Sequence, residues 1–170
     1  IISKDKKNFK INLLTTNKNI NKVFKQAKEF NVKDIIISDL SSFKKAKIKF
    51  NKSKINIHNN FQKLNKIIKT KNDIIMSSIT GLSGLGPTLK SIKFTKKILI
   101  ANKESIICGW NLINKELNKN ETEFIPVDSE HFSLWYGLRN SNNADIEKVF
   151  ITASGGPFYK TSLNKFKSIK

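Results

Sequence analysis

Two carboxylates spaced two residues apart are the clearest candidates for metal chemistry in this sequence. Asp128 and Glu130 follow the apolar residues 124–127, where Pro126 biases the preceding residue toward an extended backbone. If the chain stays extended, both side chains face the same side and offer oxygen ligands to one hard divalent cation. Oxygen ligands without cysteine favour Mg²⁺ or Mn²⁺ over Zn²⁺. The alternative is a helix cap with an acid in the first turn, and His131 as a structural residue rather than a partner of the carboxylates.

A second candidate, Asn17-Lys18-Asn19, follows the first apolar segment of the chain. In dinucleotide-binding sheets the adenosine ribose lies at this point, and an acid there favours a free 2′-hydroxyl. Lys18 instead favours a 2′-phosphate, and so predicts NADP as the cofactor. The competing interpretation is that Asn19 caps a helix while Lys18 is solvated beside it, which these residues alone favour.

Two further polar stretches also follow apolar segments. In Asn102-Lys103-Glu104, an Asn cap with Glu in the first helical turn explains two residues, but a cation at Lys103 opposes the helix dipole unless it meets an anionic ligand. A binding site and a cap therefore explain this stretch equally well. The turn over 154–156, with the hydroxyl of Ser154 beside two glycines, is either a phosphate-binding turn or a plain one.

Short apolar segments that alternate with amphipathic ones must position these residues. The pattern predicts strands at residues 11–16, 34–38, 55–57, 73–77, 97–100, 123–126 and 149–153. It predicts helices at residues 19–30, 61–68, 86–94, 103–119 and 129–138. Strands alternating with helices indicate an α/β fold with a doubly wound parallel sheet, in which ligands sit at the carboxyl ends of strands. All four polar stretches closely follow a predicted strand.

The formal net charge of +19 does not by itself predict nucleic-acid binding. Of the 32 basic residues, 31 are lysine and only Arg139 is arginine, whereas proteins that read bases use arginine heavily. The densest basic stretch, 44–54, has six lysines without a helical or strand face, so we expect a solvated connector. The single cysteine, Cys108, excludes a disulfide framework. No apolar run approaches the roughly 20 residues of a membrane span.

Three of these stretches, taken in order, resemble the 1-deoxy-D-xylulose 5-phosphate reductoisomerase family. The matching segments are Leu99-Ile100-Ala101-Asn102-Lys103-Glu104-Ser105, Pro126-Val127-Asp128-Ser129-Glu130-His131 and Ala153-Ser154-Gly155-Gly156-Pro157-Phe158. The family joins an NADPH-binding doubly wound (Rossmann-like) domain to a catalytic domain and a helical domain, and works as a homodimer. The resemblance implies conversion of 1-deoxy-D-xylulose 5-phosphate to 2-C-methyl-D-erythritol 4-phosphate in non-mevalonate isoprenoid biosynthesis. NADPH supplies the hydride, and Mg²⁺ or Mn²⁺ holds the substrate oxygens.

The resemblance also implies roles for individual residues. Metal ligands are implied at Asp128 and Glu130, and catalytic roles at Lys103 and Glu130. Substrate contacts are implied for Lys103, Ser129, Glu130 and Ser154. NADPH contacts are implied for Asn17, Lys18, Asn19, Asn102 and Glu104. Asn17 stands where the family commonly has glycine, and asparagine tolerates a left-handed backbone better than most residues.

By the same resemblance, residues 1–126 are expected to form a partial NADPH-binding domain and residues 127–170 the start of a catalytic domain. The family's first strand and Gly-rich turn are expected before residue 1, and further substrate and metal ligands after residue 170. The 170-residue chain alone is therefore expected to be inactive. We expect a cytoplasmic protein with no nucleic-acid or membrane partner. The remaining alternative is a basic α/β module that binds nucleic acid, with an affinity that falls steeply as salt rises.

Overall fold

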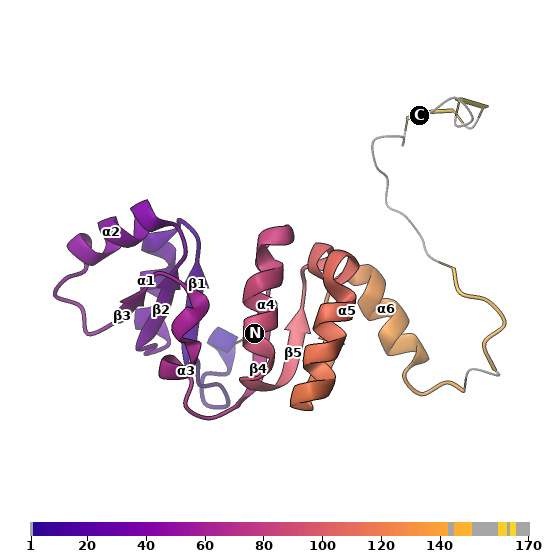
Figure 1. Ribbon diagram of the computed structural model, residues 1–170, viewed down its shortest axis with the longest axis horizontal. Helices are drawn as coiled ribbons and strands as arrows, with labels where there is room; N and C mark the ends of the chain where they lie inside the picture. The colour runs from indigo at the N-terminus through magenta and orange to yellow at the C-terminus, as the bar shows by residue number, and fades with distance from the viewer. Residues whose placement is uncertain (1, 143–144, 151–159, 163, 166–170) are drawn as a thin grey trace. The chain divides into compact units, whose positions relative to one another are not determined.

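The structure, a computed structural model, describes residues 2–142, 145–150, 160–162 and 164–165. The chain divides into two units, Ile1–Ile125 and Pro126–Lys170. The first unit contains two three-stranded sheets, with strand orders β1-β2-β3 and β4-β5-β6, and the helices that cover them (Figure 1). The second unit contains helix α6 (Ser129–Leu138).

Strands and helices alternate along the first unit, and the strands pair in parallel. The strands are β1 (Leu13–Thr16), β2 (Asp34–Ile37), β3 (Asn56–His58), β4 (Asn72–Ser77), β5 (Thr95–Ile100) and β6 (Glu123–Pro126). The helices are α1 (Ile20–Glu29), α2 (Leu40–Lys49), α3 (Leu64–Ile67), α4 (Leu85–Ile92) and α5 (Lys103–Asn120), with 3-10 turns η1 (Ile2–Lys4), η2 (Phe61–Lys63) and η3 (Leu82–Gly84). Parallel pairing joins β1 to β2, β2 to β3 and β4 to β5. The predicted α/β class with parallel strands is confirmed.

Helices cover both faces of the first sheet because side chains alternate in direction along β2. Ile35 and Ile37 are fully buried in a cluster that includes Phe24 of α1 and Ala46 of α2. Ile36 points to the opposite face and packs with the residues of α3. The three consecutive isoleucines therefore form a strand buried on both faces, as the sequence predicts.

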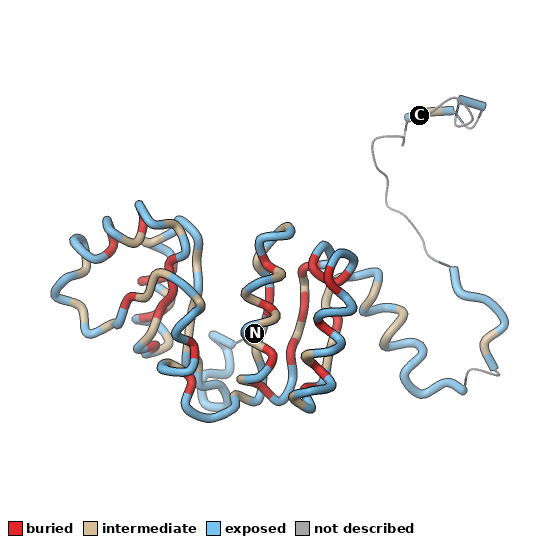
Figure 2. Tube along the Cα trace, in the orientation of Figure 1, coloured by how far each residue is buried: buried red, intermediate tan, exposed pale blue. Residues whose placement is uncertain are grey.

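Helices cover one face of the second sheet, and the opposite face carries exposed apolar side chains in the part of the chain that is described. Ile98 and Ile100 of β5 are fully buried in a cluster with residues of α4 and α5. Figure 2 shows buried residues along this strand and along the two helices. Met76 of β4 is in register with Leu99, which alternates with these isoleucines, so Met76 lies on the other face. Met76 and Ile74 are each 52% exposed. Helices thus pack on both faces of the first sheet and, among the described residues, on one face of the second.

Side chains, rather than strand pairing, connect the two sheets. Asn12, just before β1, donates a hydrogen bond to Asn72 at the start of β4, with 2.6 Å between Nδ2 and Oδ1. Ile75 of β4 and Phe94 pack in the same cluster as Ile36 of the first sheet. The amino ends of β1 and β4 therefore lie close together.

Helix α2 replaces the solvated connector that we expected over residues 44–54. Asp39 begins the helix, since its carboxylate accepts a hydrogen bond from the backbone N–H of Ser42 at 2.8 Å. Ala46 is buried, and Phe43 packs against the core of the first sheet. The expectation was wrong because the buried positions of this helix hold small residues, which leave only a weak apolar pattern among the lysines.

The remaining differences concern the lengths and ends of elements. The single helix expected over 61–68 is the turn η2 followed by the short helix α3. The strand expected over 149–153 falls mostly on residues outside the described part of the chain. Among the described residues, no helix is long and apolar enough to cross a membrane.

Candidate functional site

The polar residues that follow β1 are fixed by contacts with the end of β2. Asn17 donates a hydrogen bond from Nδ2 to the hydroxyl of Ser38 at 2.9 Å, and its carbonyl accepts from the backbone N–H of Asp39 at 3.4 Å. Asn19 is the N-cap of α1, and its Oδ1 accepts from the backbone N–H of Lys22 at 3.1 Å. The interpretation of Asn19 as a helix cap is therefore correct.

Lys18 lies exposed in this loop, and its positive charge acts on Asp39. The pKa of Asp39 is lowered to about 2, chiefly by a hydrogen bond from the Ser41 hydroxyl, with smaller contributions from hydrogen bonds donated by Ser42 and from the charge of Lys18. Asp39 is ionised at neutral pH in consequence. Lys18 therefore presents a solvated cation at the carboxyl end of β1, where the sequence analysis expects a 2′-phosphate.

Asn102 ties the loop after β4 to the start of α5. The side chain is only 3% exposed, and its Oδ1 accepts a hydrogen bond from the backbone N–H of Ser105 at 3.0 Å. Its Nδ2 donates to the carbonyl oxygens of Ile79 and Gly81. Gly84 packs so closely against this amide that no room remains for a Cβ atom. Both amide hydrogens of Asn102 are therefore used to hold the loop and the helix in place.

Lys103 and Glu104 are the first two residues of α5, and both are exposed. Their position brings a cation and a carboxylate to the carboxyl end of β5. Ser105, in the same turn, is fully buried, and its hydroxyl has no hydrogen-bond partner among the described residues. The sequence left open whether this stretch is a helix cap or a binding site. The structure shows that Asn102 caps the helix and that the charged side chains of Lys103 and Glu104 are exposed beside it.

Asp128 caps α6 and keeps one buried carboxylate oxygen without a hydrogen-bond partner among the described residues. Its Oδ1 accepts hydrogen bonds from the backbone N–H of His131 at 3.1 Å and from the ring at Nδ1, 2.7 Å away. Its Oδ2 is buried and has no hydrogen-bond partner in the described part of the chain. Burial raises the pKa of Asp128, but the hydrogen bonds from His131 outweigh burial and hold that pKa below its ordinary value. Asp128 is therefore an anion with an available, desolvated oxygen, which suits a hard cation.

The extended geometry from which we argued for Asp128 and Glu130 is wrong, because α6 begins at Ser129. Glu130 is exposed in the first turn of this helix, and one of its carboxylate oxygens accepts a hydrogen bond from the Ser129 hydroxyl at 2.7 Å. Within the described ranges, His, Cys, Asp and Glu form no group of three or more that could hold a metal ion. The buried Oδ2 of Asp128, which has no hydrogen-bond partner among the described residues, fits a cation. That Glu130 binds the same cation stays a prediction.

Some of the predicted and observed features do not coincide. Ser154 and the turn over 154–156 lie outside the described residues. Ser38 and Asp39, which hold the loop after β1, had no predicted role, although Ser38 ends a predicted strand and Asp39 follows it. For His131 the sequence left open a partner of the carboxylates and a structural residue, and favoured the structural one; its ring contacts Asp128 at 2.7 Å, since a histidine three residues after a candidate N-cap falls in the same helical turn.

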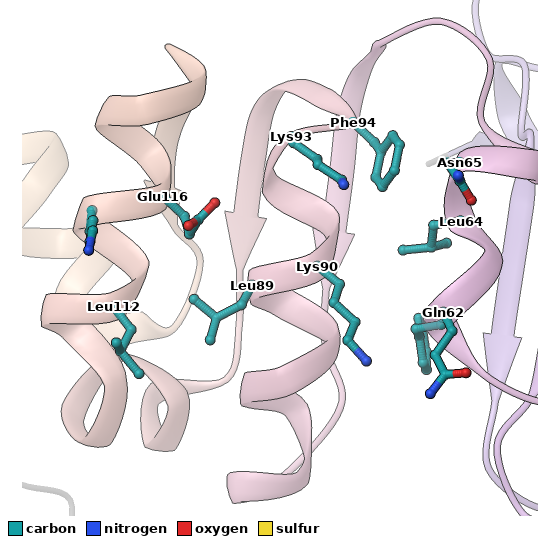
Figure 3. Close-up of a pocket in the computed structure, with 11 residues that line it drawn as sticks. Gln62, Leu64, Asn65, Leu89, Lys90, Lys93, Phe94, Leu112 and Glu116 are labelled. Carbon is teal, nitrogen blue, oxygen red and sulfur yellow. The ribbon is translucent and has the colours of Figure 1, made fainter.

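A cavity of ≈ 600 Å³ lies among η2, α3, α4 and α5 of the first unit (Figure 3). Leu89 of α4 points toward the side of the cavity that carries Leu112 of α5, whereas Lys90 and Phe94 point toward the side that carries Gln62 and Leu64 (Figure 3). None of the predicted site residues that the structure describes lines this cavity. Because lysine is abundant throughout the chain, the lysines at its edge do not indicate an anionic ligand.

Two family models match the chain. Residues 1–109 match the model described as 1-deoxy-D-xylulose 5-phosphate reductoisomerase, and residues 124–170 match the model of the C-terminal domain of that enzyme. The reductoisomerase of Pelagibacter ubique is 56% identical over 171 residues, which cover 99% of this chain and 44% of the relative. The reductoisomerase of Clostridium tetani is 36% identical over 162 residues, which cover 93% and 42%.

Solved structures give the same result. The reductoisomerase of Zymomonas mobilis, in complex with NADPH, is 30% identical with a TM-score of 0.82, over 96% of this chain and 43% of that one. A reductoisomerase in complex with NADPH, fosmidomycin and magnesium is 27% identical with a TM-score of 0.79, over 99% and 44%. The chain therefore spans about 44% of the length of such relatives.

Proposed function

This chain belongs to the 1-deoxy-D-xylulose 5-phosphate reductoisomerase family, and we propose that it forms part of an enzyme with that activity. The enzyme converts 1-deoxy-D-xylulose 5-phosphate to 2-C-methyl-D-erythritol 4-phosphate with NADPH and Mg²⁺ or Mn²⁺. It acts in non-mevalonate isoprenoid biosynthesis. Residues 1–126 contribute to the NADPH-binding domain and residues 127–170 to the catalytic domain.

The observation that carries this proposal is the buried Oδ2 of Asp128, which accepts no hydrogen bond from any described residue and lies within a sequence motif that resembles the family's metal site. A carboxylate oxygen that is desolvated and accepts no hydrogen bond costs free energy unless a cation or another donor meets it. A divalent cation, when bound there, would polarise the substrate oxygens. Asp128 would hold that cation through Oδ2, and Glu130 would join it from the first turn of α6.

The other residues bind and orient the two ligands. Lys18 pairs with the 2′-phosphate of NADPH, while Asn17 and Asn19 shape the loop that carries it. Asn102 contributes to nucleotide binding mainly by holding the start of α5, since both of its amide hydrogens are already engaged. Glu104 meets the cofactor from the first turn of the same helix.

Four side chains are proposed to contact the substrate: Lys103, Ser129, Glu130 and Ser154. Lys103 brings a cation toward a developing oxyanion of the sugar phosphate. Ser129 and Glu130 offer a hydroxyl and a carboxylate from the start of α6, and Ser154 contacts the substrate near its phosphate. We also propose that the enzyme is a cytoplasmic homodimer without nucleic-acid or membrane partners. A solved relative binds fosmidomycin together with NADPH and magnesium, which is consistent with this assignment.

The experiment compares Asp128→Asn and Glu130→Gln with the unmodified full-length protein. Each variant keeps the shape of the side chain but removes a charged ligand, so turnover should fall by about 100-fold or more. Oxidation of NADPH in the presence of substrate and Mg²⁺ is followed by absorbance, and NADPH binding by fluorescence. Binding of NADPH should change little, because it depends on other strand ends.

Asp73→Asn is the matched control for this experiment. Asp73 is an exposed aspartate at the start of β4 and pairs with Lys96 at 2.8 Å, so its loss should leave turnover unchanged. Full activity of Asp128→Asn at saturating Mg²⁺ would show that Asp128 is a helix cap without a role in catalysis.

A further inference from the structure

The two oxygens of the Asp128 carboxylate have different environments, and His131 accounts for the difference. Oδ1 accepts two hydrogen bonds, one from the backbone N–H of His131 and one from its ring. Oδ2 accepts none from the described residues and is buried. An ionised carboxylate can only accept hydrogen bonds, so the ring must carry its hydrogen on Nδ1 to make this contact.

The two bonds to Oδ1 have separate consequences. The backbone N–H caps the helix and would remain after any substitution of His131 other than proline. It leaves the carboxylate able to turn about its last side-chain bond, because one weak contact at 3.1 Å restrains only one oxygen. The ring contact at 2.7 Å adds a second, shorter bond to the same oxygen. Together they fix which oxygen points away from the cap.

We propose that His131 is a positioning residue that locks the Asp128 carboxylate with Oδ1 in the cap and Oδ2 presented to a divalent cation. This inference rests on the proposed function, which assigns a cation to Asp128. It predicts coordination through one oxygen only, since Oδ1 is already occupied by two donors. Hydrogen bonds from a neighbouring side chain commonly orient metal-binding carboxylates in this way.

A purely structural histidine–aspartate pair is the competing explanation, and the chain contains one for comparison. His58, at the end of β3, contacts Asp34 of β2 with 2.9 Å between Nε2 and Oδ1. That aspartate also accepts a hydrogen bond from Asn56 and caps no helix. His58→Ala is therefore a matched control that removes the same kind of contact away from the proposed cation site.

The test measures Mn²⁺ affinity in the metal-free full-length protein, from the electron paramagnetic resonance signal of free Mn²⁺. Three substitutions of His131 distinguish the contribution of its Nδ1 donor from that of Nε2. Asparagine places an N–H donor close to the position of Nδ1, glutamine places its donor near that of Nε2, and alanine has none. We expect His131→Ala and His131→Gln to bind Mn²⁺ about 10- to 100-fold more weakly. His131→Asn should stay within about threefold of the unmodified protein, and His58→Ala should be unchanged.

Asp128→Asn, measured in the same way, separates this inference from the proposed function. If Asp128→Asn loses Mn²⁺ binding while His131→Ala keeps it, the positioning role is overturned and the metal site stands. Equal weakening in His131→Asn and His131→Ala would also overturn the positioning role, because the restored donor should rescue binding. Unchanged Mn²⁺ affinity in Asp128→Asn would overturn the metal site itself and the inference with it.

Discussion

At the scale of single residues, several side chains that were predicted to bind ligands cap helices of the protein itself. Asn19 caps α1, Asn102 caps α5 and Asp128 caps α6. Helix starts at the carboxyl ends of parallel strands are also where ligands bind in such folds, because backbone N–H groups and the helix dipole favour anions there. A residue at such a position can therefore both cap a helix and lie beside a ligand. Lys18, next to the cap Asn19, offers a direct test of ligand binding at one of these positions.

Replacing Lys18 with alanine should weaken NADPH binding by about 10- to 100-fold and leave NADH binding almost unchanged. A lysine that pairs with a 2′-phosphate makes a charge-assisted contact that NADH lacks. Fluorescence titration of both cofactors against the full-length protein measures the difference. Lys22→Ala is the control, since Lys22 is also an exposed lysine and lies in the first turn of α1. Equal losses for the two cofactors would remove Lys18 as the residue that selects the phosphate.

At the scale of elements, the loop between β4 and α4 and the start of α5 form one packed unit. Gly81 adopts a φ of +70°, which favours glycine, and its carbonyl is bound by Asn102. The hydroxyl of Thr88 in α4 donates to the carbonyl of Gly84 at 2.7 Å and contacts the Ser77 hydroxyl of β4 at 2.6 Å. Lys103 and Glu104, whose side chains are exposed, therefore lie at a helix start that the packed neighbouring loop holds in place.

Two glycines in this region should respond to alanine in opposite ways. A Cβ at Gly84 would strike the amide of Asn102 and the carbonyl of Ile79, so Gly84→Ala should lower the free energy of unfolding by about 1–3 kcal/mol. A Cβ at Gly86, two residues on in α4, would meet nothing within 4 Å. Gly86→Ala should be neutral or stabilising by up to about 1 kcal/mol, because alanine favours the helix.

Urea denaturation of both variants, followed by circular dichroism, measures this difference. A stable Gly84→Ala protein would mean that the contact between the loop and Asn102 is loose. In that case Asn102 would not hold the start of α5 as described above.

At the scale of the whole molecule, the excess of lysine sets the electrostatic behaviour. The chain has a formal net charge of +19, and few of its lysines have acidic partners available among the 13 Asp and Glu residues. The described ion pairs of lysine are exposed, as between Lys97 and Glu123, and such pairs contribute little to stability. The comparisons with known proteins give no support for nucleic-acid binding. Self-repulsion is therefore the main expected consequence of this charge.

Raising NaCl from about 0.05 M to about 0.5 M should stabilise the protein, because salt screens repulsion between like charges. A gain of about 1 kcal/mol corresponds to a rise in melting temperature of about 2–4 °C for a protein of this size. Differential scanning calorimetry measures the melting temperature. A variant with Lys25, Lys45 and Lys66, all exposed, replaced by glutamine should show a smaller rise. A fall in melting temperature with salt would show that ion pairs outweigh the repulsion.

The sequence by itself determined the elements whose causes are local. Alternating apolar segments predicted the parallel α/β class and most strands, because burial on both faces demands runs such as 35–37. Helix starts at Asn19, Asn102 and Asp128 were visible as caps, because a cap depends on residues within one turn. The motifs that resemble the family were equally local, and the family comparisons confirm that resemblance.

Only the tertiary structure decided the features that depend on residues far apart in the chain. Helix α2 was missed because its burial comes from the first sheet rather than from its own pattern. The amide of Asn102 reaches carbonyls 21 and 23 residues away, which no local spacing predicts. The unpartnered Oδ2 of Asp128 likewise follows from the burial of one oxygen and the direction of the His131 ring. The burial of a single polar atom and the direction of a side chain are set by packing in three dimensions, and the local sequence pattern does not determine them.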